Sequence, residues 1–243
     1  MKIALQLYTV RDSWKTPQEL IETLKKVKEL GYDGVEFAGF GGIEAEQLKL
    51  ALDDIGLAAL SSHESLQDLE QRPDELLDYA KRLGCPYIGC SYSTTATREE
   101  VERTKRVMRR FTAKAKEYGM QAFYHNHSHE LLPIDGGRPL DEIKQCCLLE
   151  LDTYWVFHAE LDPVAYMREN AAHIGLIHLK DGDLEGHPCA LGEGKNDISS
   201  IVDAASQLGA QWLIVENDNP VPDGFSDAKR SLQYLKGLLR LAR

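Results

Sequence analysis

The stretch Leu176-Ile177-His178-Leu179-Lys180-Asp181 is an apolar run that ends in polar side chains. Such a run is typical of a buried β-strand. In three other stretches, apolar residues likewise lead into the segment from His125 to Glu130, into Asp152 and into Glu216. If these four strands lie side by side and parallel, their polar ends meet at one edge of the sheet, where α/β proteins bind ligands. We therefore expect a functional site at that edge.

Strand-like runs alternate with amphipathic helical runs along the whole chain. Successive runs begin about 24 to 38 residues apart, which is the length of one strand and one helix. The eight expected strands cover residues 3–7, 34–37, 58–62, 87–91, 121–125, 148–152, 174–179 and 212–216. In a chain of 243 residues, this strict alternation predicts an α/β fold, a (β/α)8 TIM barrel that forms a single domain over residues 1–243.

The expected helices carry start and stop signals. Thr16 and Thr97 each precede a helical run and have a glutamate three positions on, which is a capping box. Glycine follows several helical runs, as at Gly31, and the Gly192-Glu193-Gly194-Lys195 segment predicts a tight turn before a helix capped by Asp197. An open nucleotide-binding sheet would need a glycine-rich turn after its first strand, and residues 6–12 contain no glycine.

Composition narrows the classes of function. The net charge of −11, from 28 basic and 39 acidic residues, argues against binding to nucleic acid or to an anionic membrane surface. No apolar run approaches the ~20 residues of a membrane helix, and the first residues lead straight into a strand without the features of a signal peptide. The five cysteines form no CxxC motif, which predicts reduced thiols. We expect a cytoplasmic protein.

Three carboxylates and one imidazole at the ends of the last four strands are candidate metal ligands: Glu130, Asp152, His178 and Glu216. Each alone would be an ordinary loop or capping residue, but four on consecutive strands favour a metal site. This donor set predicts one divalent ion, Mn²⁺ first, with Mg²⁺, Co²⁺ and Zn²⁺ as alternatives. Glu150 competes with Asp152, since residues two apart on a strand point the same way, and Asp152 lies nearer the open end.

Across its length the chain resembles the xylose isomerase-like TIM barrel superfamily, in the branch of sugar phosphate isomerases and epimerases. The order and coverage of several motifs carry this resemblance. They are residues 5–12, 31–36, 125–130, 150–155, 162–163, 178–181, 192–197 and 215–216. The resemblance implies a divalent metal held by Glu130, Asp152, His178 and Glu216.

The resemblance also implies a reaction. In such enzymes the metal polarises a sugar carbonyl while a carboxylate removes the proton from the neighbouring carbon, which gives an enediolate. Glu130 and Glu216 are then the candidate acid and base. Other residues at the strand ends would bind the substrate: Tyr8, Glu36, His63, His127, Trp155 and Lys180. Epimerases of free ketoses carry Glu-Pro-x-Asn on the fifth strand, where this chain has His125-Asn126-His127, so their substrate is not transferred to it.

The expected function is isomerisation or epimerisation of a small carbohydrate: a sugar, a sugar phosphate or a cyclitol. The same site would serve a dehydratase of a keto-inositol or a lyase of a 3-keto sugar or glycoside, because an enolate either regains a proton or expels a β-leaving group. A non-catalytic sugar-binding barrel and an abasic-site endonuclease are further alternatives. The endonuclease would need more metal ligands and a basic groove, which a net charge of −11 disfavours. Barrels of this kind often pair, so a homodimer is also considered.

Overall fold

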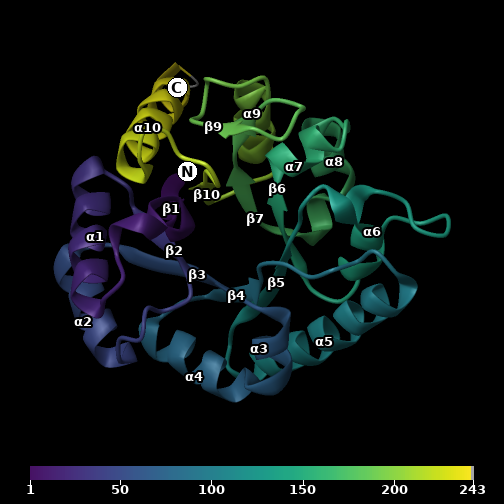
Figure 1. The fold of residues 1–243 in the computed structure, drawn as a ribbon, viewed down its shortest axis with the longest axis horizontal. Helices are drawn as coiled ribbons and strands as arrows, with labels where there is room; N and C mark the ends of the chain where they lie inside the picture. The colour runs from purple at the N-terminus through teal and green to yellow at the C-terminus, as the bar shows by residue number, and fades with distance from the viewer. Residues whose placement is uncertain (242–243) are drawn as a thin grey trace.

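Eight parallel strands close into a barrel that is surrounded by helices (Figure 1). The computed structural model describes residues 1–241. Around the barrel the strands follow the order β1-β10-β7-β6-β5-β4-β3-β2. Their bounds are β1 Lys2–Gln6, β2 Gly34–Ala38, β3 Ala58–Glu64, β4 Tyr87–Cys90, β5 Gln121–His125, β6 Leu148–Asp152, β7 Ile174–Leu179 and β10 Trp212–Val215. The TIM barrel prediction is confirmed, and the predicted strand ends differ from these by at most two residues.

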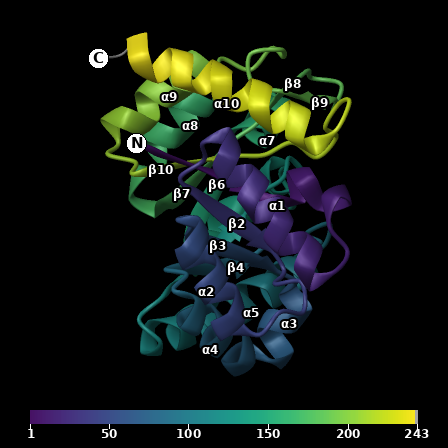
Figure 2. The same cartoon turned by 90° about the vertical axis from the view of Figure 1, so that its left-hand side faces the viewer.

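The helices lie outside the strands (Figure 2). The α-helices are α1 Pro17–Leu30, α2 Ala45–Ile55, α3 Leu66–Gln71, α4 Pro73–Leu83, α5 Arg98–Glu117, α6 Pro139–Ile143, α7 Thr153–His158, α8 Pro163–Glu169, α9 Ile198–Gln207 and α10 Gly224–Leu241. Short 3₁₀ helices are η1 Leu7–Ser13, η2 His129–Leu131 and η3 Ala171–His173. The first and last α-helices, α1 and α10, contact each other and so complete the ring.

The predicted helix signals are confirmed. Thr16 and Thr97 both form capping boxes. In each, the threonine hydroxyl accepts a hydrogen bond from the backbone N–H of the glutamate three positions on, and that glutamate's carboxylate accepts one from the threonine backbone N–H. Gly31 ends α1 in the left-handed conformation, with φ of 99°. Among the described residues, no helix is long and apolar enough to cross a membrane.

The barrel interior is layered, and this layering positions the site. Ala4, Phe123, Leu176 and Ile214 belong to a small buried cluster of their own, apart from the core between strands and helices. Side chains two residues apart on a strand point the same way. Two positions after each of these four apolar residues, the chain has a polar one: Gln6, His125, His178 and Glu216. The apolar layer therefore closes the barrel below a polar layer at the carboxyl ends of the strands.

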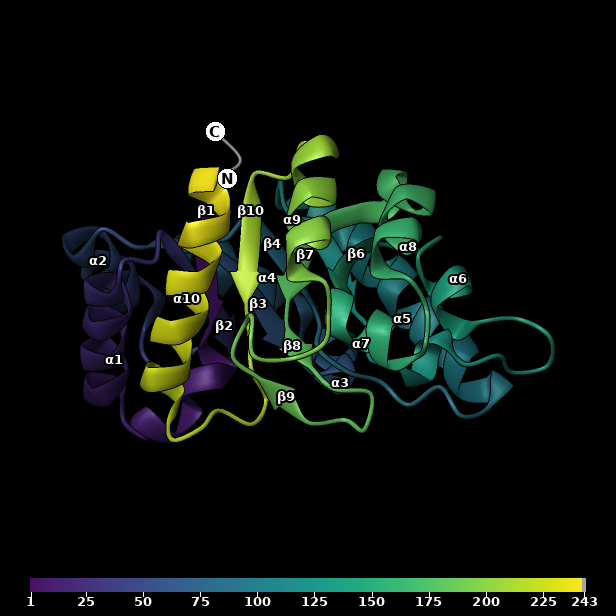
Figure 3. The same ribbon diagram turned by 90° about the horizontal axis from the view of Figure 1, so that it is seen from above.

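A two-stranded antiparallel ribbon follows β7, formed by β8 Asp181–Gly182 and β9 Pro188–Cys189. Figure 3 shows this ribbon beyond the arrowhead of β10. The Asp181 carboxylate accepts the backbone N–H groups of Gly192, Gly194 and Asn196 at 2.8–3.1 Å, and a Cβ at Gly194 would lie 2.2 Å from Asp181 Oδ1. The predicted tight turn is thus present and tied to the end of β7, and Asp197 caps α9 as expected.

Candidate metal centre

Four buried side chains converge at the carboxyl ends of β5, β6, β7 and β10: His125, Asp152, His178 and Glu216. One ligand atom of each lies within 4.8 Å of those of the other three. None of the four residues is more than 5 % exposed. Two imidazoles and two carboxylates so placed form a ligand set for a divalent cation.

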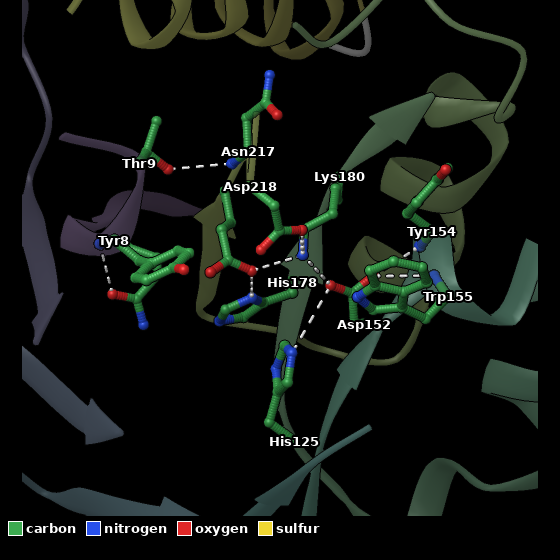
Figure 4. A network of polar contacts seen from close by, with 12 residues as sticks. Tyr8, Thr9, His125, Asp152, Tyr154, Trp155, His178, Lys180, Asn217 and Asp218 are labelled. Atoms are coloured by element: carbon green, nitrogen blue, oxygen red, sulfur yellow. Dashed lines mark hydrogen bonds and ion pairs between the residues drawn. The ribbon is translucent and has the colours of Figure 1, made fainter. Parts of the chain in front are cut away.

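Lys180 lies among the carboxylates of this group and is fully buried. Its Nζ is 3.0 Å from Asp152 Oδ2 and 2.7 Å from Asp218 Oδ2 (Figure 4). It is also 2.7 Å from Glu216 Oε2. Burial disfavours the ammonium, but the three carboxylates outweigh burial and raise the pKa of Lys180 well above its usual value. Lys180 is therefore cationic at neutral pH and neutralises part of the negative charge around it.

The two oxygens of Asp152 differ in their partners. Oδ1 caps α7 by accepting the backbone N–H groups of Tyr154 at 2.9 Å and Trp155 at 3.1 Å. Oδ2 is buried and accepts no hydrogen bond, although the Lys180 ammonium is near. The Lys180 ammonium offsets part of the cost of burying this oxygen, and because no hydrogen bond occupies it, the oxygen keeps a lone pair for a further cation. With two imidazoles and the Glu216 carboxylate in reach, the residues present fit a divalent metal.

Glu130 lies apart from this group. Its carboxylate accepts a hydrogen bond from the Tyr124 hydroxyl at 2.6 Å and one from the backbone N–H of His127 at 2.8 Å. It is fully buried in η2, five positions beyond the end of β5, whereas His125 is the last residue of that strand. The structure thus places His125 rather than Glu130 beside Asp152, His178 and Glu216. Position at the strand end is the signal that favours His125.

A second buried group lies one layer deeper in the barrel and contains His63, His125, Glu150 and His178, again with ligand atoms within 4.8 Å. Glu36 adjoins it. Residues on neighbouring strands hold the Glu36 carboxylate, since Gln6 Nε2 donates to Oε1 at 2.7 Å and Ser61 Oγ donates to Oε2 at 2.5 Å.

Burial and neighbouring charges shift the pKa values of residues in this deeper group. Burial and the nearby Glu150 carboxylate raise the pKa of Glu36 to about 7. Burial would lower the pKa of His63, but the carboxylates of Glu36 and Glu150 raise it to about 9. His63 is therefore an imidazolium at neutral pH and serves as counter-charge to the two acids.

A cavity of about 490 Å³ opens at the same end of the barrel, within the size range of small-molecule sites. Its walls include Tyr8, His63, Tyr92, His127 and Glu216. The hollow at the opposite end of the barrel is lined by no carboxylate and no imidazole. The polar chemistry therefore belongs to the cavity at the carboxyl ends of the strands.

The predicted substrate-binding residues fall into two sets. Tyr8, His63 and His127 line the cavity. Glu36 is fully buried in the deeper group, and Lys180 and Trp155 lie beside Asp152, with Lys180 Nζ 5.3 Å from the centre of the Trp155 ring. His127 has a buried Nδ1 without a partner, and burial lowers its pKa to about 2, so its imidazole is neutral.

A family model described as xylose isomerase-like TIM barrel matches residues 24–238. No curated protein sequence matches the chain. A sugar phosphate isomerase/epimerase from Parabacteroides distasonis is similar in structure, with a TM-score of 0.83, 21 % identity, and 97 % of this chain and 93 % of that chain covered.

Two further solved structures are similar over nearly their whole length. An L-ribulose 3-epimerase has a TM-score of 0.80 and 18 % identity, with 100 % of this chain and 96 % of that one covered. A probable 3-DHS dehydratase involved in petrobactin synthesis, from Bacillus anthracis, has a TM-score of 0.77 and 14 % identity, with coverages of 97 % and 99 %. At these identities the likeness demonstrates a common fold.

Proposed function

The chain belongs to the xylose isomerase-like TIM barrel family, and from this we propose that it is a metal-dependent sugar isomerase or epimerase. The observation that carries the proposal is the convergence of His125, Asp152, His178 and Glu216 beside a cavity large enough for a monosaccharide. The substrate would be a small carbohydrate with a carbonyl next to a carbon that bears a hydrogen and a hydroxyl.

These four residues would hold the metal. Bound there, a divalent ion would polarise the carbonyl and stabilise negative charge on its oxygen. The mixed imidazole and carboxylate set suits Mn²⁺, Co²⁺ or Zn²⁺ better than Mg²⁺, which prefers oxygen ligands, and we propose Mn²⁺ first.

Glu216 is the proposed base that removes the proton. It lines the cavity and is only 5 % exposed. Burial would raise the pKa of this carboxyl, but the Lys180 ammonium and the His178 ring beside it hold it well below its usual value. The carboxylate is therefore ionised at neutral pH and available to accept a proton.

Epimerisation needs a second group that returns a proton from another side of the substrate. His127 follows β5, which is separated from β10 by β6 and β7, so His127 and Glu216 face the cavity from different directions. With a pKa of about 2, the neutral His127 imidazole carries no proton to return, and its unpaired Nδ1 suits a hydrogen bond from a substrate hydroxyl. We propose Glu130 as the group that returns the proton, because burial raises the pKa of its carboxyl, and its 2.8 Å hydrogen bond also holds the His127 backbone in place.

Aromatic side chains around the cavity would position the sugar. Tyr8 and Tyr92 line its mouth and are 42 % and 51 % exposed, so their ring faces are open to a ligand. Trp155 lies beside Asp152 and has a buried indole Nε1 without a partner. Stacking of a sugar face on such rings, with hydroxyls near His63 and His127, would fix which carbon faces Glu216.

The proposal is tested by incubating metal-reconstituted protein with ketoses, inososes and 3-keto sugars in D₂O. An isomer of the substrate that carries deuterium at the carbon next to the carbonyl supports isomerisation or epimerisation. Loss of water or of an aglycone supports the alternative dehydratase or lyase, since the same proton abstraction begins both. Sugar binding without deuterium uptake would indicate the non-catalytic barrel. Cleavage of abasic-site DNA would indicate the endonuclease.

Pairing and location are separate proposals. We propose a cytoplasmic protein and consider a homodimer, and light scattering during gel filtration gives the mass of the particle. A mass near the 27.3 kDa of one chain would contradict the dimer.

A further inference from the structure

We propose that Glu36 and Glu150 are positioning residues for the metal centre, each accepting the second ring N–H of one metal-binding imidazole. Glu36 would act on His178, and Glu150 on His125. The inference rests on the proposed function because it takes both histidines as ligands. It assigns a role to the deeper buried group, which the proposed reaction otherwise leaves without one.

The two nitrogens of His178 contact carboxylates in different layers. Nδ1 is 3.2 Å from Glu216 Oε2, which belongs to the four candidate metal ligands (the metal group). Nε2 faces the deeper group and lies 2.6 Å from Glu36 Oε1 and 3.2 Å from Glu150 Oε2, so Glu36 is its nearer partner. A neutral imidazole carries one N–H and one lone pair. If Nε2–H donates to Glu36, the lone pair on Nδ1 points toward the metal group, as a ligand requires.

His125 repeats this arrangement with its nitrogens exchanged. Nδ1 is 3.2 Å from Glu150 Oε2, and Nε2 is 3.9 Å from Asp152 Oδ2. A hydrogen bond from Nδ1–H to Glu150 leaves the Nε2 lone pair toward the metal group. The two carboxylates thus select opposite tautomers of two ligands on different strands.

The two carboxylates are themselves fixed. Glu36 is held by Gln6 and Ser61. His63 bridges the acids, since its Nε2 contacts Glu150 Oε2 and lies 3.2 Å from Glu36 Oε1. The His63 ring also stacks on that of His178, with centroids 5.5 Å apart and planes 10° from parallel. Such a rigid surrounding limits rotation of the ligand rings, and rigid ligands bind a metal more tightly.

A second metal in the deeper group is the competing explanation. It would have to use His125 and His178 through the nitrogens that face Glu150 and Glu36, while the metal centre uses the other two. Each bridging imidazole would then lose both N–H protons, which is a much rarer state than a neutral ring that donates to a carboxylate. The structure therefore favours one metal with two carboxylate–imidazole pairs behind it.

The first test compares Glu36→Gln and Glu150→Gln with a matched control, Glu64→Gln. Glu64 is also a buried carboxyl at a barrel strand end, but it bonds Ser62 Oγ at 2.7 Å and belongs to neither buried group. Metal content and the dissociation constant for Zn²⁺ and Co²⁺ are measured by titration against a chelator. We expect the native protein and the control to bind one equivalent of metal with the same affinity. Glu36→Gln and Glu150→Gln should bind the metal about 10–100-fold more weakly.

Ser61→Ala is a milder variant, to be used in case Glu36→Gln does not fold. It removes one donor to Glu36 and leaves every carboxylate and imidazole of the site in place. We expect weaker metal binding than in the native protein, but a smaller loss than in Glu36→Gln.

The second test reads the tautomers directly. In Zn²⁺-loaded protein labelled with ¹⁵N-histidine, NMR should show His178 protonated at Nε2 and His125 protonated at Nδ1. Glu36→Gln should perturb the His178 N–H signal alone. Glu150→Gln should perturb the His125 N–H signal more than that of His178, because Glu150 Oε2 also lies 3.2 Å from His178 Nε2. A merely structural role would affect both rings equally or neither.

Three outcomes would overturn the inference: metal affinity within about twofold of native in both Gln variants, the opposite tautomers, or two bound equivalents with one lost in Glu150→Gln. The proposed function can fail independently. If the variants weaken metal binding as expected but the protein exchanges no proton on any carbohydrate, the positioning role stands and the proposed reaction is wrong.

Discussion

Lys180 Nζ lies 2.7 Å from Glu216 Oε2, and both residues are almost completely buried. The same ammonium contacts Asp152 and Asp218, so one cation is shared by three acids at the proposed metal centre. Removing one partner from a buried charge cluster leaves the others uncompensated, which is far more costly than losing a surface pair.

Lys180→Met should therefore destabilise the metal-free protein by about 3–5 kcal/mol, measured by urea unfolding. Added metal should restore part of this loss because it binds the folded state and supplies positive charge. The control is Lys49→Met, which removes an exposed pair with Asp53 and should cost no more than about 0.5 kcal/mol. If Lys180→Met unfolds at the same urea concentration as the native protein, the charge cluster does not contribute to stability as described.

The identity of the ligand from β5 can be tested with two variants. His125→Ala should lose bound metal, because it removes one of the four converging ligands. Glu130→Gln should keep its metal, because the Glu130 carboxylate is engaged by Tyr124 and the His127 backbone. Metal analysis of both purified proteins decides the matter. Retention by His125→Ala and loss by Glu130→Gln would restore the ligand set predicted from the sequence.

Glu64 gives a prediction about pH and stability. Burial raises the pKa of its carboxyl from 4.5 to about 7. The folded state thus binds a proton more tightly than the unfolded state, so this residue's contribution to stability is complete below pH 4.5 and disappears as the pH rises to about 7. Glu64→Gln should match the native protein near pH 4 and exceed it by on the order of 2 kcal/mol at pH 8. Parallel stability curves for the two proteins would refute this.

Glu142 gives the opposite case. Arg98 and Lys105 contact its carboxylate at 2.6 and 2.7 Å and lower its pKa to about 2. A lowered pKa contributes stability above the unfolded value of about 4.5, and this is lost as the pH falls toward 2. Because the side chain is 28 % exposed, we expect Glu142→Gln to cost only about 1 kcal/mol at pH 7 and nothing near pH 2. Chemical denaturation of both proteins at pH 7 and near pH 2 checks the direction of this change in stability.

Strand positions followed from the sequence because apolar alternation and capping are local properties. β5, β6 and β7 have the bounds expected from the residue pattern. His125 and Glu130 both belong to the segment that ends the fifth strand, and the residue pattern alone does not decide which of them is the ligand. The sequence does not reveal that residues 126–130 turn back so that Tyr124 and the His127 N–H engage Glu130, since this contact depends on the path of the loop.

The sequence also does not predict how deep a side chain lies inside the barrel. Alternation shows that Glu36 points inward, but its height relative to His178 depends on the stagger of the strands, including the irregular register between β2 and β3 at Val35 and Glu36. This places Glu36 beside Gln6, Ser61 and His178 instead of in the cavity. Glu150 and Asp152 point the same way, as predicted, and each occupies a different layer.

The most direct test of the central claim is deuterium uptake from D₂O into a carbohydrate panel, read by mass, for native protein with metal, native protein after chelation, and metal-treated Asp152→Asn. We predict uptake at the carbon next to the carbonyl in the first sample, and loss of about 10²-fold or more in the other two. Uptake that persists undiminished after chelation, or its absence from every carbohydrate while the protein carries a full equivalent of metal, would contradict metal-assisted proton transfer at this site.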